Sequence, residues 1–273
     1  MSLVVNSNIA GLNSARSLGV ADRQLTTSIE RLSSGSRINR AADDAASLGV
    51  AEGLRTQIGG LRVALRNSQD GISVLQTAEG ALTETHSLLH RMRDLAVQAA
   101  NTGGLDDAAR ANVQTEMGQL GAELDRIAQT TSFNGRELLD GSYRGTFQVG
   151  ADVGHTITVG FGPAMDAAGL GVAGVDVTSP TGPSTALAAI DAAIGQVSTA
   201  RAELGAVQNR FEHNIAKVGV ALDNTTASES RIRDADIAAE TTTMSRASIL
   251  TQAGTAMAAQ ANQSPRGVLQ LLR

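Results

Sequence analysis

The sequence contains no cysteine and no tryptophan, and only one tyrosine and four phenylalanines among its 273 residues. The absence of cysteine excludes disulfides, thiolate metal sites and cysteine nucleophiles. Because aromatic residues make up only 2% of the chain, a core must be built from Leu, Ile, Val and Ala, which suit narrow seams between helices. The composition therefore favours a helical bundle over a broad globular core.

Long apolar runs and an excess of basic charge are also missing. No run approaches the roughly 18 apolar residues of a membrane span, and the N-terminal segment lacks the charged start and apolar stretch of a cleavable signal peptide. The net charge of -5 argues against nucleic-acid binding, which requires a basic face to neutralise phosphates. We therefore expect neither a membrane nor a nucleic-acid partner, and any export would leave the N-terminus uncleaved.

Heptad spacing of apolar residues is the clearest positive pattern, and it predicts three helices. The first is about 50 Å long and is expected to end at NTGG, residues 101–104. The second follows it and includes residues 113–127. The third begins after TGPST, with Ser184 or Thr185 as its cap, and continues to residue 222. The stripe of the first helix is Leu54, Ile58, Leu61, Leu65, Ile72, Leu75, Leu82 and Leu89.

The composition changes over residues 132–183, which contain eleven glycines. Within this stretch GTFQVGADVGHTITVGF alternates apolar and polar residues around a turn. This pattern predicts a β-hairpin with Phe147 and Val149 in one strand and Ile157 and Val159 in the other.

Both ends of the chain read as Ala-rich helices with few apolar residues, which need each other or a neighbouring molecule for stability. The predicted fold is mainly α: a long antiparallel helical bundle with a small β-hairpin, and N- and C-terminal helices paired as a coiled coil. We expect an N-terminal arm at 1–42, a bundle domain at 43–230 with a short insert at about 142–183, and a C-terminal arm at 231–273. The chain ends on the apolar segment VLQLLR, which implies a partner surface, such as another copy of the chain.

Several segments closely resemble bacterial flagellin. They include SIERLSSGSRINRAADDAASLGVAEGL, NSQDGISVLQTAEGAL, RMRDLAVQAANTG, TSFNGRELLDG, SRIRDADIAAE and the C-terminal ILTQAGTAMAAQANQSPRGVLQLLR. The resemblance implies an extracellular subunit of the flagellar filament, exported through the flagellum's own channel and polymerised at its distal tip. In that family the terminal helices form the inner tube of the filament and the bundle forms the outer tube.

The partners that this resemblance implies are further copies of the chain, an export chaperone, the filament cap and the hook-filament junction proteins. It also implies recognition by Toll-like receptor 5, through Arg91, Leu95 and Glu116, and by inflammasome sensors through the C-terminal leucines. From the apolar pattern of the arms we predict a set of residues in the polymer interface. These are Leu25, Ile29, Leu32, Met244, Leu250, Met257, Leu269 and Leu272.

No pattern in the sequence supports an enzyme, a cofactor or a metal site. His86 and His90 lie four residues apart, but Ser87 occupies the position of the glutamate in the zinc-protease motif H-E-x-x-H, and no third ligand is evident. GLGVAG at 169–174 has the glycine spacing of a dinucleotide-binding loop, but no helix is expected after it. The alternatives to a filament subunit are a hook-filament junction protein and, in another class, a coiled-coil signalling or membrane-surface protein.

Overall fold

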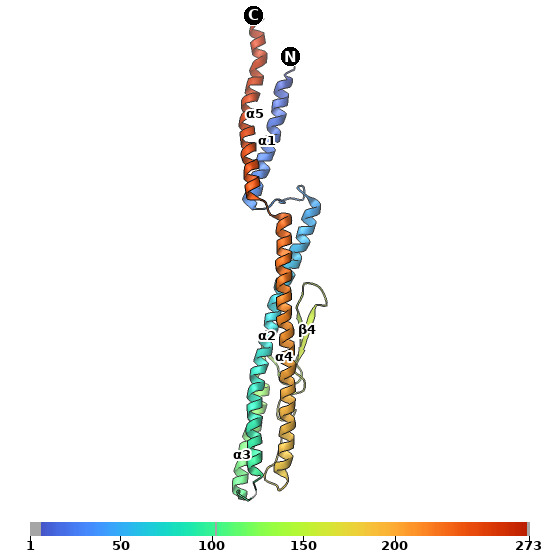
Figure 1. The fold of residues 1–273 in the computed structure, drawn as a ribbon, viewed down its shortest axis with the longest axis vertical. Coiled ribbons are helices and arrows are strands. Elements are labelled where there is room, and N and C mark those ends of the chain that lie inside the picture. The colour runs from blue at the N-terminus through green and yellow to red at the C-terminus, as the bar shows by residue number, and fades with distance from the viewer. Residues whose placement is uncertain (1–6, 102, 272–273) are drawn as a thin grey trace. The chain divides into compact units, whose positions relative to one another are not determined.

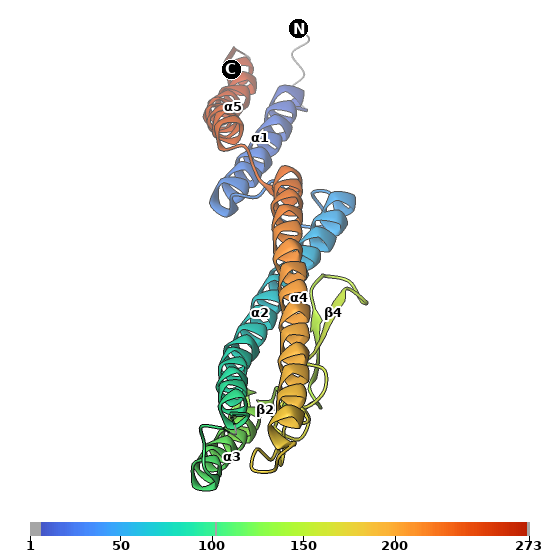
Figure 2. The same cartoon turned by 60° about the horizontal axis from the view of Figure 1, so that its bottom comes forward.

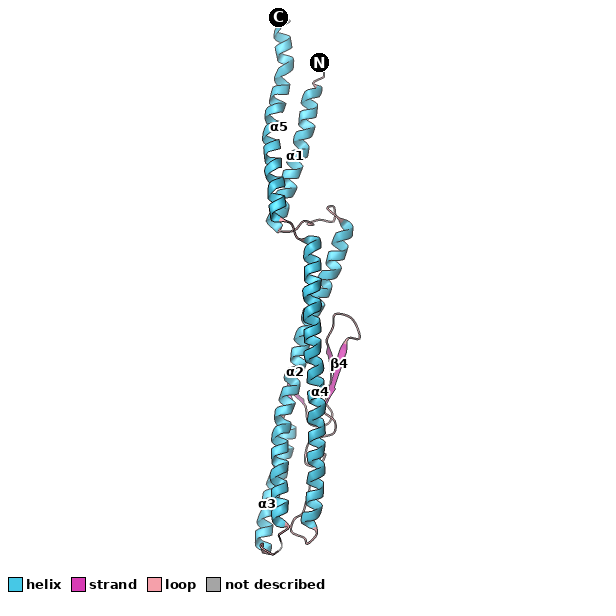
Figure 3. Ribbon diagram, viewed as in Figure 1, coloured by secondary structure: helices cyan, strands magenta, loops and turns pink. Residues whose placement is uncertain are grey.

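The computed structural model describes residues 7–101 and 103–271, with side chains described up to residue 263. Within these residues the chain forms five α-helices and two antiparallel two-stranded sheets (Figures 1 and 3). It divides into two compact units, one of residues 1–56 with 224–273 and the other of Gln57–Asp223. The predicted mainly helical fold is confirmed. The helices are α1 (Ile9–Ser34), α2 (Ala45–Ala99), α3 (Asp107–Thr130), α4 (Gly182–Arg233) and α5 (Ile237–Leu271).

The unit of residues 57–223 is an antiparallel bundle made by α3 and parts of α2 and α4 (Figure 2). Ion pairs fix the opposite directions of α2 and α4: Arg93 contacts Asp191 at 2.7 Å, and Glu79, further towards the start of α2, contacts Arg201 at 3.7 Å. The predicted heptad stripe of α2 supplies part of the core, together with residues of α3 and α4. Fully buried members are Leu75, Leu82 and Leu89 on α2, Leu124 on α3, and Ile190, Val197 and Phe211 on α4.

The predicted hairpin is confirmed as β3 (Arg144–Gln148) and β4 (Thr156–Gly160), with Phe147 opposite Ile157. A second, shorter hairpin was not predicted; it consists of β1 (Ser132–Phe133) and β2 (Arg136–Glu137). Asn134 and Gly135 join its strands with φ values of 50° and 76°. Two consecutive residues of positive φ form the tight turn that suits two-residue hairpins, and Asn-Gly favours it.

The predicted cap of α4 was wrong by about one turn. The helix begins at Gly182, and the hydroxyls of Ser184 and Thr185 donate to the carbonyl of Thr181 from within the first turn. Pro183 is compatible with this start, because backbone N–H groups in the first turn of a helix have no acceptor within the helix, so the N–H that proline lacks is not needed. The predicted break at 101–104 is confirmed, since α2 ends at Ala99 and α3 begins at Asp107.

The other unit is dominated by α1 and α5, which lie side by side and antiparallel (Figures 1 and 2). Their register is set near one end by Arg31 and Glu240, 3.7 Å apart. At the other end the amide nitrogen of Asn8 donates to the carbonyl of Ala261 at 2.9 Å. The predicted pairing of the terminal helices is confirmed, whereas coiled-coil geometry and the arm boundaries stay predictions. No helix among the described residues is long and apolar enough to cross a membrane.

Candidate functional site

The interface between α1 and α5 is made of small residues. Among the side chains described on these two helices, only Ala21, Ser28 and Ala247 are buried. Gly254 faces Leu18 so closely that an added Cβ would lie 3.3 Å from the Leu18 Cδ1 atom. Small residues let two helices approach closely, but they bury little apolar area. The interface between α1 and α5 therefore contributes little hydrophobic stabilisation of its own.

Many of the large apolar side chains of α1 and α5 are instead exposed to solvent. Eight of them are at least half exposed, on both helices and along most of the described length. Soluble monomers rarely leave such extended apolar surface uncovered, and where it occurs it marks an interaction site. The eight are Ile9, Leu12, Val20 and Ile29 on α1, and Ile237, Ile249, Leu250 and Met257 on α5.

A groove runs along one side of the pair and concentrates this surface. Val20 of α1 and Leu250 and Met257 of α5 contribute to its walls, together with Leu18 and Gly254. Its volume is about 430 Å³, and every residue that lines it is uncharged. Such a groove is suited to apolar side chains from another molecule rather than to an ionic ligand.

Three of the predicted interface residues, Ile29, Leu250 and Met257, are at least half exposed, and therefore available to another molecule. Three others, Leu25, Leu32 and Met244, are partly buried, whereas Leu272 and the side chain of Leu269 lie outside the described residues. Sequence reasoning did not include some exposed residues of the same surface. These are Ile9, Leu12, Val20, Ile237 and Ile249.

Backbone pairing holds the two helices together where α1 ends and α5 begins. The N–H of Arg37 donates to the carbonyl of Arg233 at 2.6 Å, and the N–H of Ala235 donates to the carbonyl of Gly35 at 2.9 Å. Gly35 ends α1 with a φ of 70°, a conformation that glycine adopts without strain. These bonds pin the start of the helix pair and thereby orient the apolar residues along it.

The three predicted receptor-contact residues lie in the bundle unit. The Arg91 guanidinium on α2 donates from Nε and Nη2 to one carboxylate oxygen of Glu116 on α3, at 2.8 and 2.6 Å. Both side chains are about half exposed, whereas Leu95 is 2% exposed. Arg91 and Glu116 therefore form one polar feature at the surface, whereas Leu95 belongs to the buried core of the unit.

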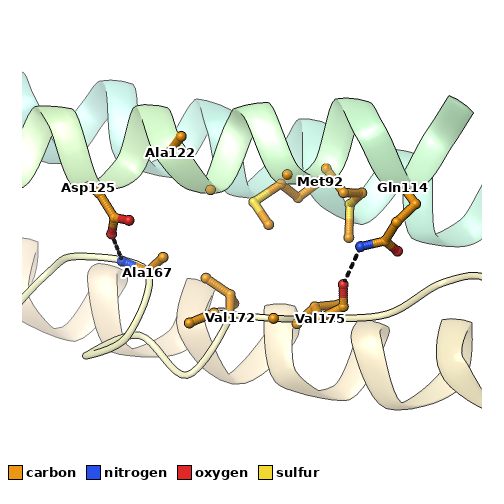
Figure 4. Close-up of a pocket in the computed structure, with 12 residues that line it drawn as sticks. Met92, Gln114, Ala122, Asp125, Ala167, Val172 and Val175 are labelled. Carbon is orange, nitrogen blue, oxygen red and sulfur yellow. Dashed lines mark hydrogen bonds between the residues drawn. The ribbon is translucent and has the colours of Figure 1, made fainter.

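A second cavity lies in the bundle, between α2, α3 and the loop of residues 165–177 (Figure 4). It measures about 280 Å³ and is lined mainly by small and apolar residues. Its polar side chains are already engaged: Asp125 accepts from the Ala167 N–H at 2.9 Å, and the Gln114 amide donates to the Val175 carbonyl at 2.8 Å (Figure 4). These two hydrogen bonds fix the loop to α3, so the polar side chains that line the cavity are not free for chemistry.

The dinucleotide-like segment 169–174 forms turns in this loop and does not lead directly into a helix. It therefore lacks the helix N-terminus that binds a pyrophosphate in dinucleotide-binding folds. The described residues give no arrangement that resembles a catalytic centre. The exposed apolar surface of α1 and α5 is the strongest candidate for a functional site.

Known protein families match both ends of the chain. Residues 5–144 match the bacterial flagellin N-terminal helical region, and residues 187–272 match the bacterial flagellin C-terminal helical region. The chain belongs to the bacterial flagellin family. Its relatives are similar over nearly their whole length: flagellin of Bacillus subtilis is 45% identical over 98% of this chain and 99% of its own.

Two further comparisons extend this finding to filaments and to structure. The flagellar filament 30.7 kDa core protein of Treponema maltophilum is 41% identical over 99% of this chain and 100% of its own. The crystal structure of Bacillus cereus flagellin matches 56% of this chain and 88% of its own with 33% identity and a TM-score of 0.50. Flagellins are structural proteins, and the helical fold with a small β part agrees with this family.

Proposed function

We propose that this chain is a subunit of the bacterial flagellar filament, and that it polymerises through the exposed apolar surface of α1 and α5. The observation that carries the proposal is the contrast between the small-residue interface of this helix pair and the large apolar residues outside it. Packing on neighbouring copies would bury those residues. A patch that contacts a different patch on the next copy, without closing into a ring, produces an open helical filament.

The family relationship supports the same assignment. A relative that aligns over the full chain is named as a filament core protein, and no feature of the described residues favours the hook-filament junction protein. In this proposal the arms at 1–42 and 231–273 form the inner tube and residues 43–230 form the outer tube. The protein is extracellular, acts without enzymatic activity, and meets an export chaperone, the filament cap and the junction proteins during assembly.

Replacing exposed apolar residues by alanine tests the polymerisation surface. Full burial of a Leu or Met side chain contributes about 1.5–3 kcal/mol, and Leu250 and Met257 are 50% and 62% exposed. Burying their exposed parts contributes about 1.5–3 kcal/mol for the two together, so the double alanine variant should raise the critical concentration about 10- to 100-fold. Alanine keeps the helical propensity high, so α5 itself should not be weakened.

The assay is elongation from sheared filament seeds, read as the subunit concentration left in solution and by negative-stain microscopy. Val153→Ala is the matched control, because Val153 is fully exposed at the tip of the β3–β4 hairpin, in the other unit. An unchanged critical concentration for the double variant would contradict the proposed surface. A chain lacking residues 264–273 tests the apolar tail separately, and failure of the full chain to elongate any seed would favour the junction protein.

Recognition by Toll-like receptor 5 is proposed at Arg91 and Glu116, with Leu95 supporting them from the core. Arg91→Ala should reduce activation in a receptor reporter assay while the chain keeps its helical content by circular dichroism. Arg93→Ala is the matched control, since Arg93 also pairs with a carboxylate on another helix, that of Asp191. Equal effects of the two substitutions would argue against a specific contact. Recognition of the C-terminal leucines by inflammasome sensors is proposed on the family resemblance alone.

A further inference from the structure

Two histidines on α2 bring their side-chain nitrogens together at the surface of the bundle unit. His86 and His90 are one helical turn apart, and their Nε2 atoms lie 2.9 Å from each other. His90 is exposed and His86 is half-buried, so solvent reaches the pair. Neither the flagellar assignment nor the polymerisation surface uses these two residues.

The distance between the two nitrogens matches a specific kind of metal coordination. Imidazole nitrogens bind a first-row metal at about 2.0–2.1 Å. Two nitrogens at that distance from one ion and 2.9 Å from each other subtend about 90° at the metal, which is the angle between neighbouring ligands in square-planar or octahedral geometry. Tetrahedral zinc would require the rings to move slightly apart, whereas Cu²⁺ and Ni²⁺ fit the observed spacing.

The burial of the His86 ring also determines which of its nitrogens can reach a metal. The buried Nδ1 of His86 has no hydrogen-bond partner, which leaves Nε2 as the nitrogen that faces a ligand. When His90 is the donor of the contact between the two rings, its Nε2 carries a proton that a bound metal must displace. A proton is then taken up from solvent by the Nδ1 atom of His90, so no net proton is released.

Three arginines of the bundle unit are engaged in ion pairs, which reduces their repulsion of a cation at the histidines. The guanidinium groups of Arg91 and Arg93 on α2 and of Arg201 on α4 are each paired with a carboxylate from another helix, at 2.6, 2.7 and 3.7 Å. Because those carboxylates are engaged, they are not available as further ligands. Within the described residues no three His, Asp or Glu side chains are grouped as a metal site, so water must fill the remaining positions.

We propose that His86 and His90 form a two-histidine site for a borderline divalent transition metal, with Cu²⁺ bound most tightly. Sequence reasoning gave no metal site, because it required a third protein ligand. Two nitrogens held at the correct spacing on one rigid helix are sufficient for chelation, since the second bond forms within the same molecule. The order of affinity should follow Ni²⁺ below Cu²⁺ and Cu²⁺ above Zn²⁺.

The test is a Cu²⁺ titration of the full, unpolymerised chain, followed by calorimetry and by electron paramagnetic resonance. We expect one ion per chain with two equatorial nitrogens. His86→Gln and His90→Gln should each weaken binding about 100-fold, because each removes one arm of the chelate. The chain has four histidines, so His155→Gln with His213→Gln is the matched control and should leave the affinity unchanged.

Three results would overturn the proposal: no saturable binding, a spectrum with a single nitrogen, or an affinity that survives the combined loss of His86 and His90. The spectrum of the unaltered chain is informative even if a variant folds poorly, because it counts the nitrogens directly. Far-UV circular dichroism without metal checks the fold of each variant.

Discussion

A close contact between α2 and α4 predicts that Gly71 can accept a methyl group only with strain. A Cβ added at Gly71 would lie 2.6 Å from the Cζ atom of Phe211, about 1 Å inside the normal distance between carbon atoms. Phe211 is fully buried and packs edge-on against Phe147, with ring centroids 5.6 Å apart. Its ring therefore has little room to retreat, and we expect Gly71→Ala to strain the core.

The size of the effect follows from two opposing contributions. Replacing glycine by alanine inside a helix stabilises it by about 1 kcal/mol, whereas forcing an extra methyl group into a packed core costs about 1–3 kcal/mol. The change in unfolding free energy for Gly71→Ala should therefore lie between about zero and 2 kcal/mol of destabilisation. Gly80→Ala in the same helix is the matched control, because no atom lies within 4 Å of its added Cβ, and it should stabilise.

The assay is urea unfolding followed by tyrosine fluorescence. The chain has one tyrosine and no tryptophan, and Tyr143 is buried in the bundle unit, so the signal reports that unit alone. Gly71→Ala should lower the midpoint relative to Gly80→Ala, and adding Phe211→Leu to Gly71→Ala should cost less than it does alone. If Gly71→Ala stabilised the chain as much as Gly80→Ala, the steric argument would be refuted.

Two further predictions concern the bundle unit. Asp125→Ala should lower the unfolding free energy by about 1–3 kcal/mol, because it leaves the Ala167 N–H beside the cavity without its acceptor. Urea unfolding measures this change, and Thr115→Ala is the control because the Thr115 hydroxyl is exposed. An effect of Asp125→Ala no larger than that of Thr115→Ala would contradict the prediction. The lowered pKa of His86 means that the unfolded chain binds the proton more readily, so stability is complete above about pH 6.5 and falls on acidification through the folded pKa. Midpoints measured from pH 8 to pH 5 should show this fall, and a slope unchanged in His86→Gln would assign it to another group.

The helices and the β3–β4 hairpin could be predicted because they depend on local periodicity. Apolar residues at heptad spacing identify a buried stripe whatever the partner is, and the positions from Leu75 to Leu89 are buried as expected. The β1–β2 hairpin was missed although Asn134 and Gly135 are a strong turn signal. Its strands have only two residues each, which is too short for an alternation of polar and apolar residues to be recognised.

The metal-binding pair shows a different limit of sequence reasoning. Spacing placed His86 and His90 on one face of a helix, but it did not give the distance between the two Nε2 atoms. That distance depends on the rotamers of the two side chains, which the spacing along the chain does not determine. The pairing of Arg91, Arg93 and Arg201 with carboxylates depends on the packing of three helices, so the compensation of their charge could not be predicted either.

The polymerisation surface could be located from the sequence but not mapped. An apolar stripe on a terminal helix can be buried inside one chain or against a neighbouring chain, and the sequence does not distinguish the two. Leu25 and Ile29 were therefore predicted in the same way, although only Ile29 is largely exposed. What separates the two cases is the pairing of α1 with α5 through Ala21 and Ala247. Because alanine occupies the seam, the larger residues beside it are left outside, and the surface that a neighbouring copy would cover follows from where the small residues lie.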